Sequence, residues 1–266
     1  MNYIPITDLN LPSLLIYKQL RDKAFTNDNS FIADSPKVIN KLLKSDLEVK
    51  SILATQEYYD EFHDLVSAKN ISHLYLADKS LMQEIVGHKV HHNAMMHGIR
   101  PANISLENLG SHIIMLDEIS STENIGSIAR SAAALGVTSY LLPSQGPHPY
   151  QRRALRVSMG HISLLDVHIY HNIFETISTL QKKGYHILAA EVTKESISLA
   201  QIKVPDKWVL LMGHEGKGIS QDILNVCNQV VKIEMEDGIK SFNVAVAASI
   251  MMYHFRNTSK ALNIPL

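Results

Sequence analysis

The sequence has little that would cross-link the chain or anchor it in a membrane. It holds one cysteine, Cys227, among 266 residues, which excludes a disulfide framework and a cysteine-rich zinc site. No apolar run reaches the roughly 18–20 residues that a membrane-spanning helix needs. Residues 1–20 also lack the basic start and apolar centre of a signal peptide. We therefore expect a cytoplasmic protein with no membrane segment.

The sequence also has little excess charge of either sign. The net charge is −1, whereas a protein that binds nucleic acid indiscriminately carries a strong positive excess. A nucleic-acid partner would therefore be contacted at specific places. The obvious arginine cluster consists of Arg152, Arg153 and Arg156. We expect these arginines either to bind phosphates or to form a solvated basic face.

Strands that alternate with short helices predict an α/β protein. Apolar residues make up 45% and charged residues 19% of the chain, close to the average of globular proteins. In the first part the pattern predicts helices at 14–23, 36–43, 56–68 and 79–86, and strands at 31–33, 49–53 and 73–76. A polar connector around residues 101–110 then divides the chain near residue 105, into domains 1–105 and 106–266.

The second part repeats the alternation with stronger signals. It predicts strands at 112–116, 139–142, 164–170, 185–190 and 208–212, and helices at 125–135, 173–183 and 244–255. The last of these helices is apolar on nearly every face, so it must be packed deep or used in an interface. We expect a homodimer, and a monomer with a thick helix layer is the alternative.

A glycine-rich segment follows the strand at 208–212. This segment, the glycine loop, reads Gly213-His214-Glu215-Gly216-Lys217-Gly218. In α/β proteins, a glycine-rich loop directly after a strand leaves backbone groups accessible to a small molecule. Because Gly218 follows Lys217, the loop is not a phosphate loop of the Walker type. A simple tight turn is the alternative, although a turn does not require the carboxylate of Glu215.

Two further polar elements stand at the ends of strands. Asn124 opens a helix that contains Arg130, and a second strand leads into Ser241-Phe242-Asn243 before the apolar helix. Helix capping alone would explain Asn124, Ser241 or Asn243. The occurrence of all three elements in order, each at a strand end, favours one shared ligand site.

Together these elements resemble the signature motifs of the SpoU (TrmH-like) RNA 2′-O-ribose methyltransferases. The similar segments are residues 124–130, 212–218 and 241–247, and Val157-Ser158-Met159-Gly160 resembles a short Ser-x-Gly segment of that family. The resemblance covers roughly residues 110–257. The N-terminal part resembles, less specifically, a substrate-binding domain like ribosomal protein L30e.

The resemblance implies S-adenosyl-L-methionine as cofactor, an active homodimer, and a parallel sheet whose C-terminal segment forms a deep trefoil knot. It also implies RNA as partner, with Arg152, Arg153 and Arg156 on its phosphates. The implied catalytic residues are Asn124, Arg130, Glu215, Ser241 and Asn243, and the implied cofactor-binding residues are Gly213, Gly218, Ile233, Met235 and Phe242.

Two positions depart from the family pattern. The third motif commonly reads Ser-Leu-Asn, whereas this chain has Phe242 at the centre. Both side chains are large and apolar, so packing beside the cofactor should survive. Residues 33–35, Ala-Asp-Ser, stand where relatives often have a Glu-Gly pair, and substrate contacts there stay open.

The reaction that the resemblance implies is methyl transfer to a ribose 2′-hydroxyl. An additional N-terminal domain suggests a large structured target, so ribosomal RNA is favoured over transfer RNA. Two alternatives are a non-catalytic RNA-binding or assembly factor and methylation of another acceptor, such as a base nitrogen. A guanidinium holds its proton too tightly to be a base, so we expect Arg130 to stabilise the developing alkoxide as a cation.

Histidines gather at positions 88, 91, 92 and 97. No thiolate accompanies them, and a strand would send the adjacent His91 and His92 to opposite faces. We therefore expect no metal there, but a polar strand edge or an RNA contact.

Overall fold

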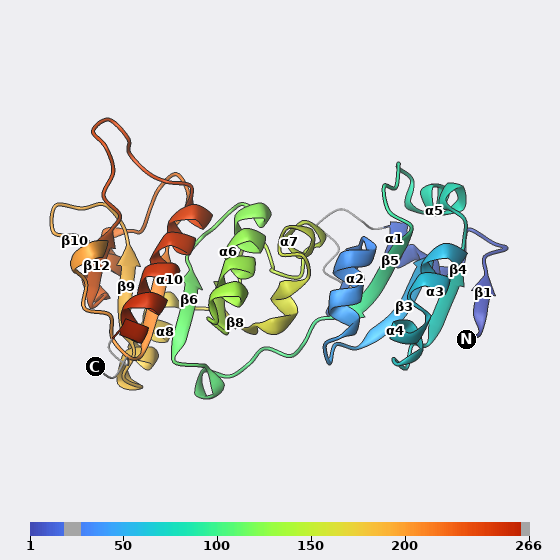
Figure 1. The fold of residues 1–266 in the computed structure, drawn as a ribbon, viewed down its shortest axis with the longest axis horizontal. Coiled ribbons are helices and arrows are strands. Elements are labelled where there is room, and N and C mark those ends of the chain that lie inside the picture. The colour runs from blue at the N-terminus through green and yellow to red at the C-terminus, as the bar shows by residue number, and fades with distance from the viewer. Residues whose placement is uncertain (19–27, 262–266) are drawn as a thin grey trace. The chain divides into compact units, whose positions relative to one another are not determined.

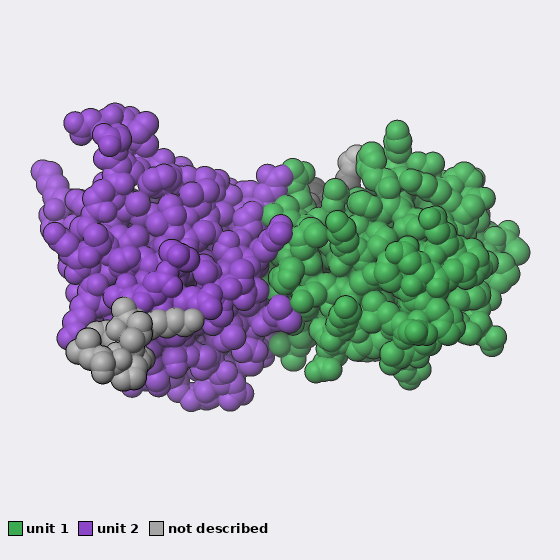
Figure 2. Space-filling model, in the orientation of Figure 1, with its two compact units in different colours: residues 1–102, 149–163 green, residues 103–148, 164–266 purple. Residues whose placement is uncertain are grey.

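The computed structural model describes residues 1–18 and 28–261. The chain forms two compact units (Figure 2): unit 1 comprises Met1–Ala102 and Pro149–Ser163, and unit 2 comprises Asn103–His148 and Leu164–Leu266. A segment from the second half of the sequence therefore belongs with the N-terminal residues. The division into domains 1–105 and 106–266 stays a prediction, as does the likeness of the first part to ribosomal protein L30e.

Unit 1 is built on a five-stranded mixed sheet with the strand order β1-β4-β3-β5-β2 (Figure 1). Strands β1, β4 and β3 run parallel, and β5 runs antiparallel to both of its neighbours, β3 and β2. The strands are β1 (Tyr3–Pro5), β2 (Ser30–Asp34), β3 (Val49–Ala54), β4 (His73–Leu76) and β5 (Ala94–Ile99).

The helices of unit 1 cover this sheet, and one buried cluster joins Tyr17 of α1 and Met82 of α5 to Tyr75 and Met95 of the sheet. The helices are η1 (Pro12–Leu14), α1 (Leu15–Lys18), α2 (Pro36–Leu43), α3 (Gln56–Glu61), α4 (His63–Ser67), α5 (Lys79–Val86) and α7 (Arg152–Val157), with η3 (His161–Leu164) after α7.

Two predicted helices of unit 1 differ from the structure. The helix expected at 14–23 starts as η1 and continues as α1 to Lys18, and residues 19–23 lie outside the described residues. The helix expected at 56–68 is interrupted at Phe62, whose φ of −116° separates α3 from α4. The Phe62 ring packs against Tyr58 there, with ring centroids 5.1 Å apart.

Strand β5 was not predicted from the sequence, although it is an inner strand of the sheet. Its residues Ala-Met-Met-His-Gly-Ile hold one β-branched side chain and a glycine, a composition with low strand propensity. A Cβ at Gly98 would overlap the ring of Phe31 on the neighbouring strand. Pairing with the neighbouring strands and close packing across the sheet therefore stabilise this strand, rather than the intrinsic strand propensity of its residues.

Unit 2 contains a seven-stranded sheet in which every pair of neighbours is parallel, with the order β10-β12-β9-β11-β6-β7-β8. The predicted α/β class with a parallel sheet is confirmed, and the trefoil knot stays a prediction. The strands are β6 (His112–Leu116), β7 (Ser139–Pro143), β8 (Asp166–Tyr170), β9 (His186–Ala190), β10 (Ile197–Ser198), β11 (Trp208–Met212) and β12 (Gln229–Lys232).

Helices lie on both faces of this sheet. On one face, Ile177 of α8 and Ile223 of α9 join a buried cluster with alternate residues of the inner strands, such as Val209. On the other face, Tyr140 donates a hydrogen bond to the Ile125 carbonyl of α6, and Trp208 packs edge-on against Phe255 of α10. The helices are α6 (Thr122–Leu135), α8 (Ile173–Lys182), α9 (Gln221–Val226) and α10 (Val244–Ala261), with the short η2 (Leu106–Asn108) and η4 (Leu199–Gln201).

Helix α10 divides its apolar residues between the core and the surface. Met251 and Met252 are buried, whereas Val246, Ile250 and Tyr253 are 47%, 36% and 61% exposed. The helix also lies against α6, where Ser249 donates a hydrogen bond to Ser131. Within the described part of the chain, no helix combines the length and apolar character needed to cross a membrane.

Ser35 gives a test of backbone strain in unit 1. Its φ of 78° and ψ of 138° fall where residues other than glycine rarely lie, at a cost of about 1–3 kcal/mol. Glycine adopts this conformation freely but loses about 0.5–1 kcal/mol more in backbone entropy on folding. We expect Ser35→Gly to raise the free energy of unfolding by about 1 kcal/mol, measured by urea denaturation.

The control is Ser178→Gly, at an exposed position inside helix α8 (Ile173–Lys182), which should lower the free energy of unfolding by about 0.5–1 kcal/mol. A loss of stability in both variants would contradict the strain at Ser35.

Candidate active site

A pocket of about 680 Å³ lies at the carboxyl ends of β9, β11 and β12. Parallel strands bring these ends to one edge of the sheet, so the segments that follow the strands line the pocket together. They are residues 190–193, 212–219, 231–233 and Met235. Residues 240–244, before and at the start of α10, also line the pocket, together with Gln221 and Leu224 of α9 and Ala247 and Met251 of α10. The volume suits a small molecule, since such sites measure about 300–1,000 Å³.

The glycine loop folds back on itself at this edge. The Gly218 N–H donates to the His214 carbonyl at 2.9 Å, and a Cβ at Gly213 would overlap the Gly218 backbone. The His214 ring holds the tip, because its Nδ1 accepts from the backbone N–H groups of Gly216 at 2.9 Å and Lys217 at 3.3 Å. The loop is therefore a closed backbone structure and more than a simple turn.

Glu215 joins the glycine loop to the N-terminus of α6. Its Oε1 accepts from Asn124 Nδ2 at 2.9 Å and from the Ser121 N–H at 3.2 Å. Its Oε2 accepts from the N–H and the hydroxyl of Ser120 at 3.2 and 3.1 Å. One carboxylate thus holds together two segments that are 91 to 95 positions apart in the sequence.

Asn243 extends this network to the start of α10. Its Nδ2 donates to Asn124 Oδ1 at 3.1 Å, while its own Oδ1 accepts from the backbone N–H groups of Ala245 at 2.9 Å and Val246 at 3.3 Å. Asn243 therefore both caps the start of α10 and belongs to the polar network beside the pocket.

The interpretation of Asn124 as a helix cap is wrong. Helix α6 begins at Thr122 rather than at Ile125, and Ser121 is its N-cap, with its hydroxyl accepting from the Asn124 N–H at 3.3 Å. The amide of Asn124 is therefore free to bridge Glu215 and Asn243. A serine just before the helix was the sequence signal for this cap.

The network keeps Glu215 ionised. Partial burial opposes its charge, but the hydrogen bonds from Asn124 and from the backbone outweigh burial and lower the pKa of the carboxyl to about 2. The carboxylate is then an acceptor of hydrogen bonds at every pH above that value, and a weak base.

The structure brings most of the implied site residues to the pocket. Glu215, Ser241 and Asn243 line it, and so do all of the implied cofactor-binding residues, Gly213, Gly218, Ile233, Met235 and Phe242. Asn124 reaches it through hydrogen bonds. Arg130 stands apart: it is exposed on α6, and it makes no hydrogen bond or ion pair with any residue in the described ranges.

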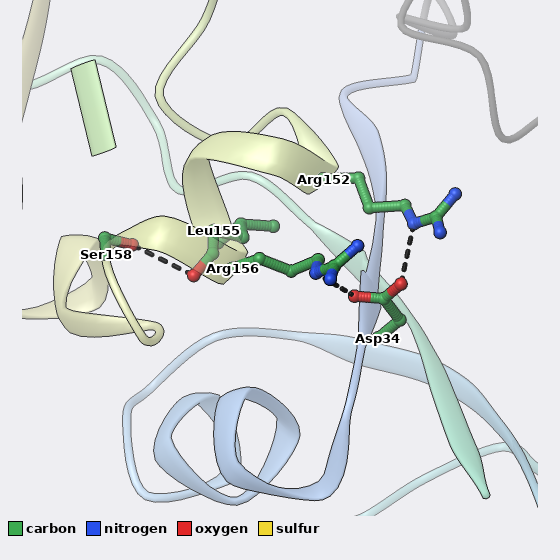
Figure 3. A network of polar contacts seen from close by, with 5 residues as sticks. All are labelled: Asp34, Arg152, Leu155, Arg156 and Ser158. Atoms are coloured by element: carbon green, nitrogen blue, oxygen red, sulfur yellow. Dashed lines mark hydrogen bonds and ion pairs between the residues drawn. The ribbon is translucent and has the colours of Figure 1, made fainter. Parts of the chain in front are cut away.

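The arginine cluster lies in unit 1, where Arg152 and Arg156 of α7 converge on Asp34 at the end of β2 (Figure 3). Arg152 Nε donates to Asp34 Oδ2 at 2.8 Å, and Arg156 Nε lies 3.6 Å from Oδ1. The Asp34 side chain is 8% exposed, against 25% for Arg152 and 49% for Arg156. These two arginines therefore neutralise a buried carboxylate and are not a purely solvated face. Contact of Arg152, Arg153 and Arg156 with RNA stays a prediction.

The histidines near residue 90 surround the same carboxylate. His88, His91 and His92 line a cavity of about 20 Å³ together with Asp34, which has room for about one water molecule. Burial lowers the pKa of His92, against the attraction of Asp34. Across residues 1–18 and 28–261, no group of three or more His, Cys, Asp or Glu side chains is arranged to hold a metal ion.

Comparison with known proteins places these observations in a family. The model of the SpoU rRNA methylase family matches residues 111–253, more than half of the chain. The chain belongs to the SpoU rRNA methylase family. Among family relatives, an uncharacterized tRNA/rRNA methyltransferase of Mycobacterium bovis is 26% identical over 228 residues, which are 84% of this chain and 79% of that protein.

Solved structures share the fold over nearly the whole chain. An AdoMet-bound rRNA methyltransferase from Sinorhizobium meliloti superimposes with a TM-score of 0.81 at 20% identity, over 96% of this chain and 98% of that one. The SpoU methyltransferase AviRb from Streptomyces viridochromogenes, in complex with AdoMet, gives 0.80 at 18% identity, over 94% and 98%. Identities this low show the fold alone, and both units of this SpoU family member share it.

Because the pKa of Glu215 is low, the free energy of unfolding of this SpoU protein should vary with pH in the acid range. The pKa of a glutamate is about 4.3 in the unfolded chain, and that of Glu215 is about 2 in the folded protein. The stability that the charge contributes is therefore fully present above the pKa of the unfolded chain. It should be lost as the pH falls from about 4.3 towards 2. We expect the advantage of the native protein over Glu215→Gln, measured by urea denaturation at a series of pH values, to shrink in that window.

Glu195→Gln, at an exposed carboxylate, is the matched control and should show no such window. A difference between the native protein and Glu215→Gln that is constant from pH 6 to pH 2 would contradict the role of the charge.

A further prediction concerns the ion pair between Asp34 and Arg152 in unit 1. Breaking a buried ion pair from one side costs about 3–5 kcal/mol, and because Arg152 is partly exposed we expect Arg152→Ala to cost about 2 kcal/mol. Asp34→Asn removes the buried charge, so the double variant Asp34→Asn/Arg152→Ala should lose less than the sum of the single variants. Urea denaturation of the four proteins measures the cycle, and strictly additive losses would refute the pairing.

Proposed function

We propose that this protein transfers a methyl group from S-adenosyl-L-methionine to a ribose 2′-hydroxyl of RNA. The observation that carries the proposal is the network of Glu215, Asn124 and Asn243, which assembles polar groups from three distant segments beside one pocket. Relatives named tRNA/rRNA methyltransferases match most of the chain, and two structural neighbours are complexes with the same cofactor.

The pocket fits S-adenosyl-L-methionine in size and in chemistry. Ile233, Met235 and Phe242 offer apolar surface suited to a purine ring. Gly213, Gly216 and Gly218 also line the pocket, so the glycine loop offers backbone groups to a ligand there. When bound, this cofactor supplies an activated methyl group.

The residues of the chain would then position and activate a weak hydroxyl nucleophile. Glu215, with a pKa of about 2, is too weak a base to take the hydroxyl proton at neutral pH. Its role is to orient the Asn124 amide, which in turn bonds Asn243. Arg130 would stabilise the developing alkoxide as a cation and bind the adjacent phosphate, with water or phosphate as the proton acceptor.

The proposal includes a homodimer in the cytoplasm. The exposed apolar side chains Val246, Ile250 and Tyr253 of α10 form a face that a second copy would cover. Arg130 lies on the neighbouring helix α6 rather than in the pocket lining, so its partners are expected from the substrate or from a second copy. Ribosomal RNA is the favoured substrate and transfer RNA the alternative.

Methylation mapping tests the proposal. We expect cells that lack this protein to lose 2′-O-methylation at a defined ribosomal RNA nucleotide, and the native chain to restore it.

Arg130→Ala should bind S-adenosyl-L-methionine with unchanged affinity but lose turnover by at least about 100-fold, as when one transition-state contact is removed. Arg130→Lys, which keeps the charge without the planar fork, is the matched control and should recover part of the turnover.

Loss of a methyl group from transfer RNA instead would reassign the substrate. No lost site in either RNA would favour a non-catalytic RNA-binding factor, and near-normal turnover of Arg130→Ala would remove the role given to Arg130.

A further inference from the structure

Glu191 lies at the end of β9, where the segments that line the pocket meet. Its backbone N–H donates to the Val231 carbonyl of β12 at 3.2 Å. Its Oε2 accepts from the backbone N–H of Ile219, directly after the glycine loop, at 2.9 Å, and its Oε1 accepts from the Val192 N–H at 2.9 Å. One residue therefore ties together β9, β12 and the segment after β11.

The same carboxylate packs against the last glycine of the loop. Gly218 has a φ of 68°, and a Cβ there would overlap Glu191 Oε2. Position 218 thus favours glycine because of its left-handed backbone, and the carboxylate of Glu191 would have to move to make room for a side chain there. The conformation of the loop and the position of Glu191 depend on each other.

Backbone amides, rather than a cation, hold this carboxylate. Glu191 is half-buried and lines the pocket, and it forms no ion pair with any cation in residues 1–18 and 28–261. Hydrogen bonds from N–H groups to a charged oxygen are stronger than those between neutral groups. The bond to Ile219 spans 28 positions of the sequence, so it fixes the exit of the glycine loop rather than a local turn.

We propose that Glu191 is a positioning residue of the methyl-transfer site: its carboxylate holds the glycine loop against the ends of β9 and β12 and so sets the shape of the cofactor pocket. The identity of the ligand rests on the proposed function, whereas the hydrogen bond to Ile219 is a property of the protein alone. The two are therefore tested by different measurements.

The first measurement is hydrogen exchange at the Ile219 amide in protein without cofactor. Glu191→Ala removes the acceptor, and we expect this amide to exchange at least about 10-fold faster, as for a lost charged hydrogen bond. Glu191→Gln keeps an amide oxygen that can accept the same N–H, so exchange should stay within about 3-fold of the native rate. Glu195→Ala, an exposed glutamate four positions along, is the matched control and should change nothing.

The second measurement is the affinity for S-adenosyl-L-methionine by calorimetry, followed by kinetics. We expect Glu191→Ala to weaken binding about 10-fold and to raise the cofactor KM with little change in kcat, while Glu191→Gln restores both. Gly218→Ala should also weaken binding, but the double variant Glu191→Ala/Gly218→Ala should lose less than the product of the two effects, because the overlap is gone.

The outcomes distinguish the positioning role of Glu191 from the proposed use of S-adenosyl-L-methionine. Native exchange at Ile219 in Glu191→Ala overturns the positioning role, whatever the affinity. Equal losses in Glu191→Ala and Glu191→Gln also overturn it, because then the acceptor is not what matters. Faster exchange in a protein whose native form does not bind S-adenosyl-L-methionine supports the positioning role and refutes the proposed cofactor.

Discussion

The carboxylate of Glu215 is the interaction on which the arrangement of the proposed site depends. It accepts four hydrogen bonds from Ser120, Ser121 and Asn124, so the loop after β11 and the start of α6 keep one mutual geometry. Burial alone would favour the neutral acid, but the donors lower the pKa to about 2. The charge is therefore kept at neutral pH, and each of these bonds is charge-assisted.

A carboxylate with little access to solvent organises unit 1 by the same physics. Asp34 draws Arg152 and Arg156 from a segment more than 100 positions away, because an unpaired buried charge is costly. Next to Asp34, Ser35 takes a φ of 78°, a value that suits glycine.

The elements with strong local signals were predicted closely. Strands β6 and β11 are apolar runs bounded by polar residues, and α5 lies between a capping Asp78 and a left-handed Gly87, so their ends coincide with those expected. Strand β5 was missed, since its residues have low strand propensity and become ordered by pairing. Helix α7 was missed although its Arg, Ala and Leu residues favour a helix, because six residues are too short a stretch to show a helical period. The interruption at Phe62 likewise accompanies a packing contact.

The sequence by itself determined the α/β class, the motifs of the pocket and the family to which they belong, because glycine loops and caps act over a few residues. Only the tertiary structure decided that Asn124 bridges Glu215 and Asn243 instead of capping α6. It also decided that Arg152 and Arg156 of α7 face Asp34 and that Glu191 bonds to the residue after the glycine loop. Each of these contacts joins residues far apart in the chain, and their meeting depends on strand order and burial, which no local pattern encodes.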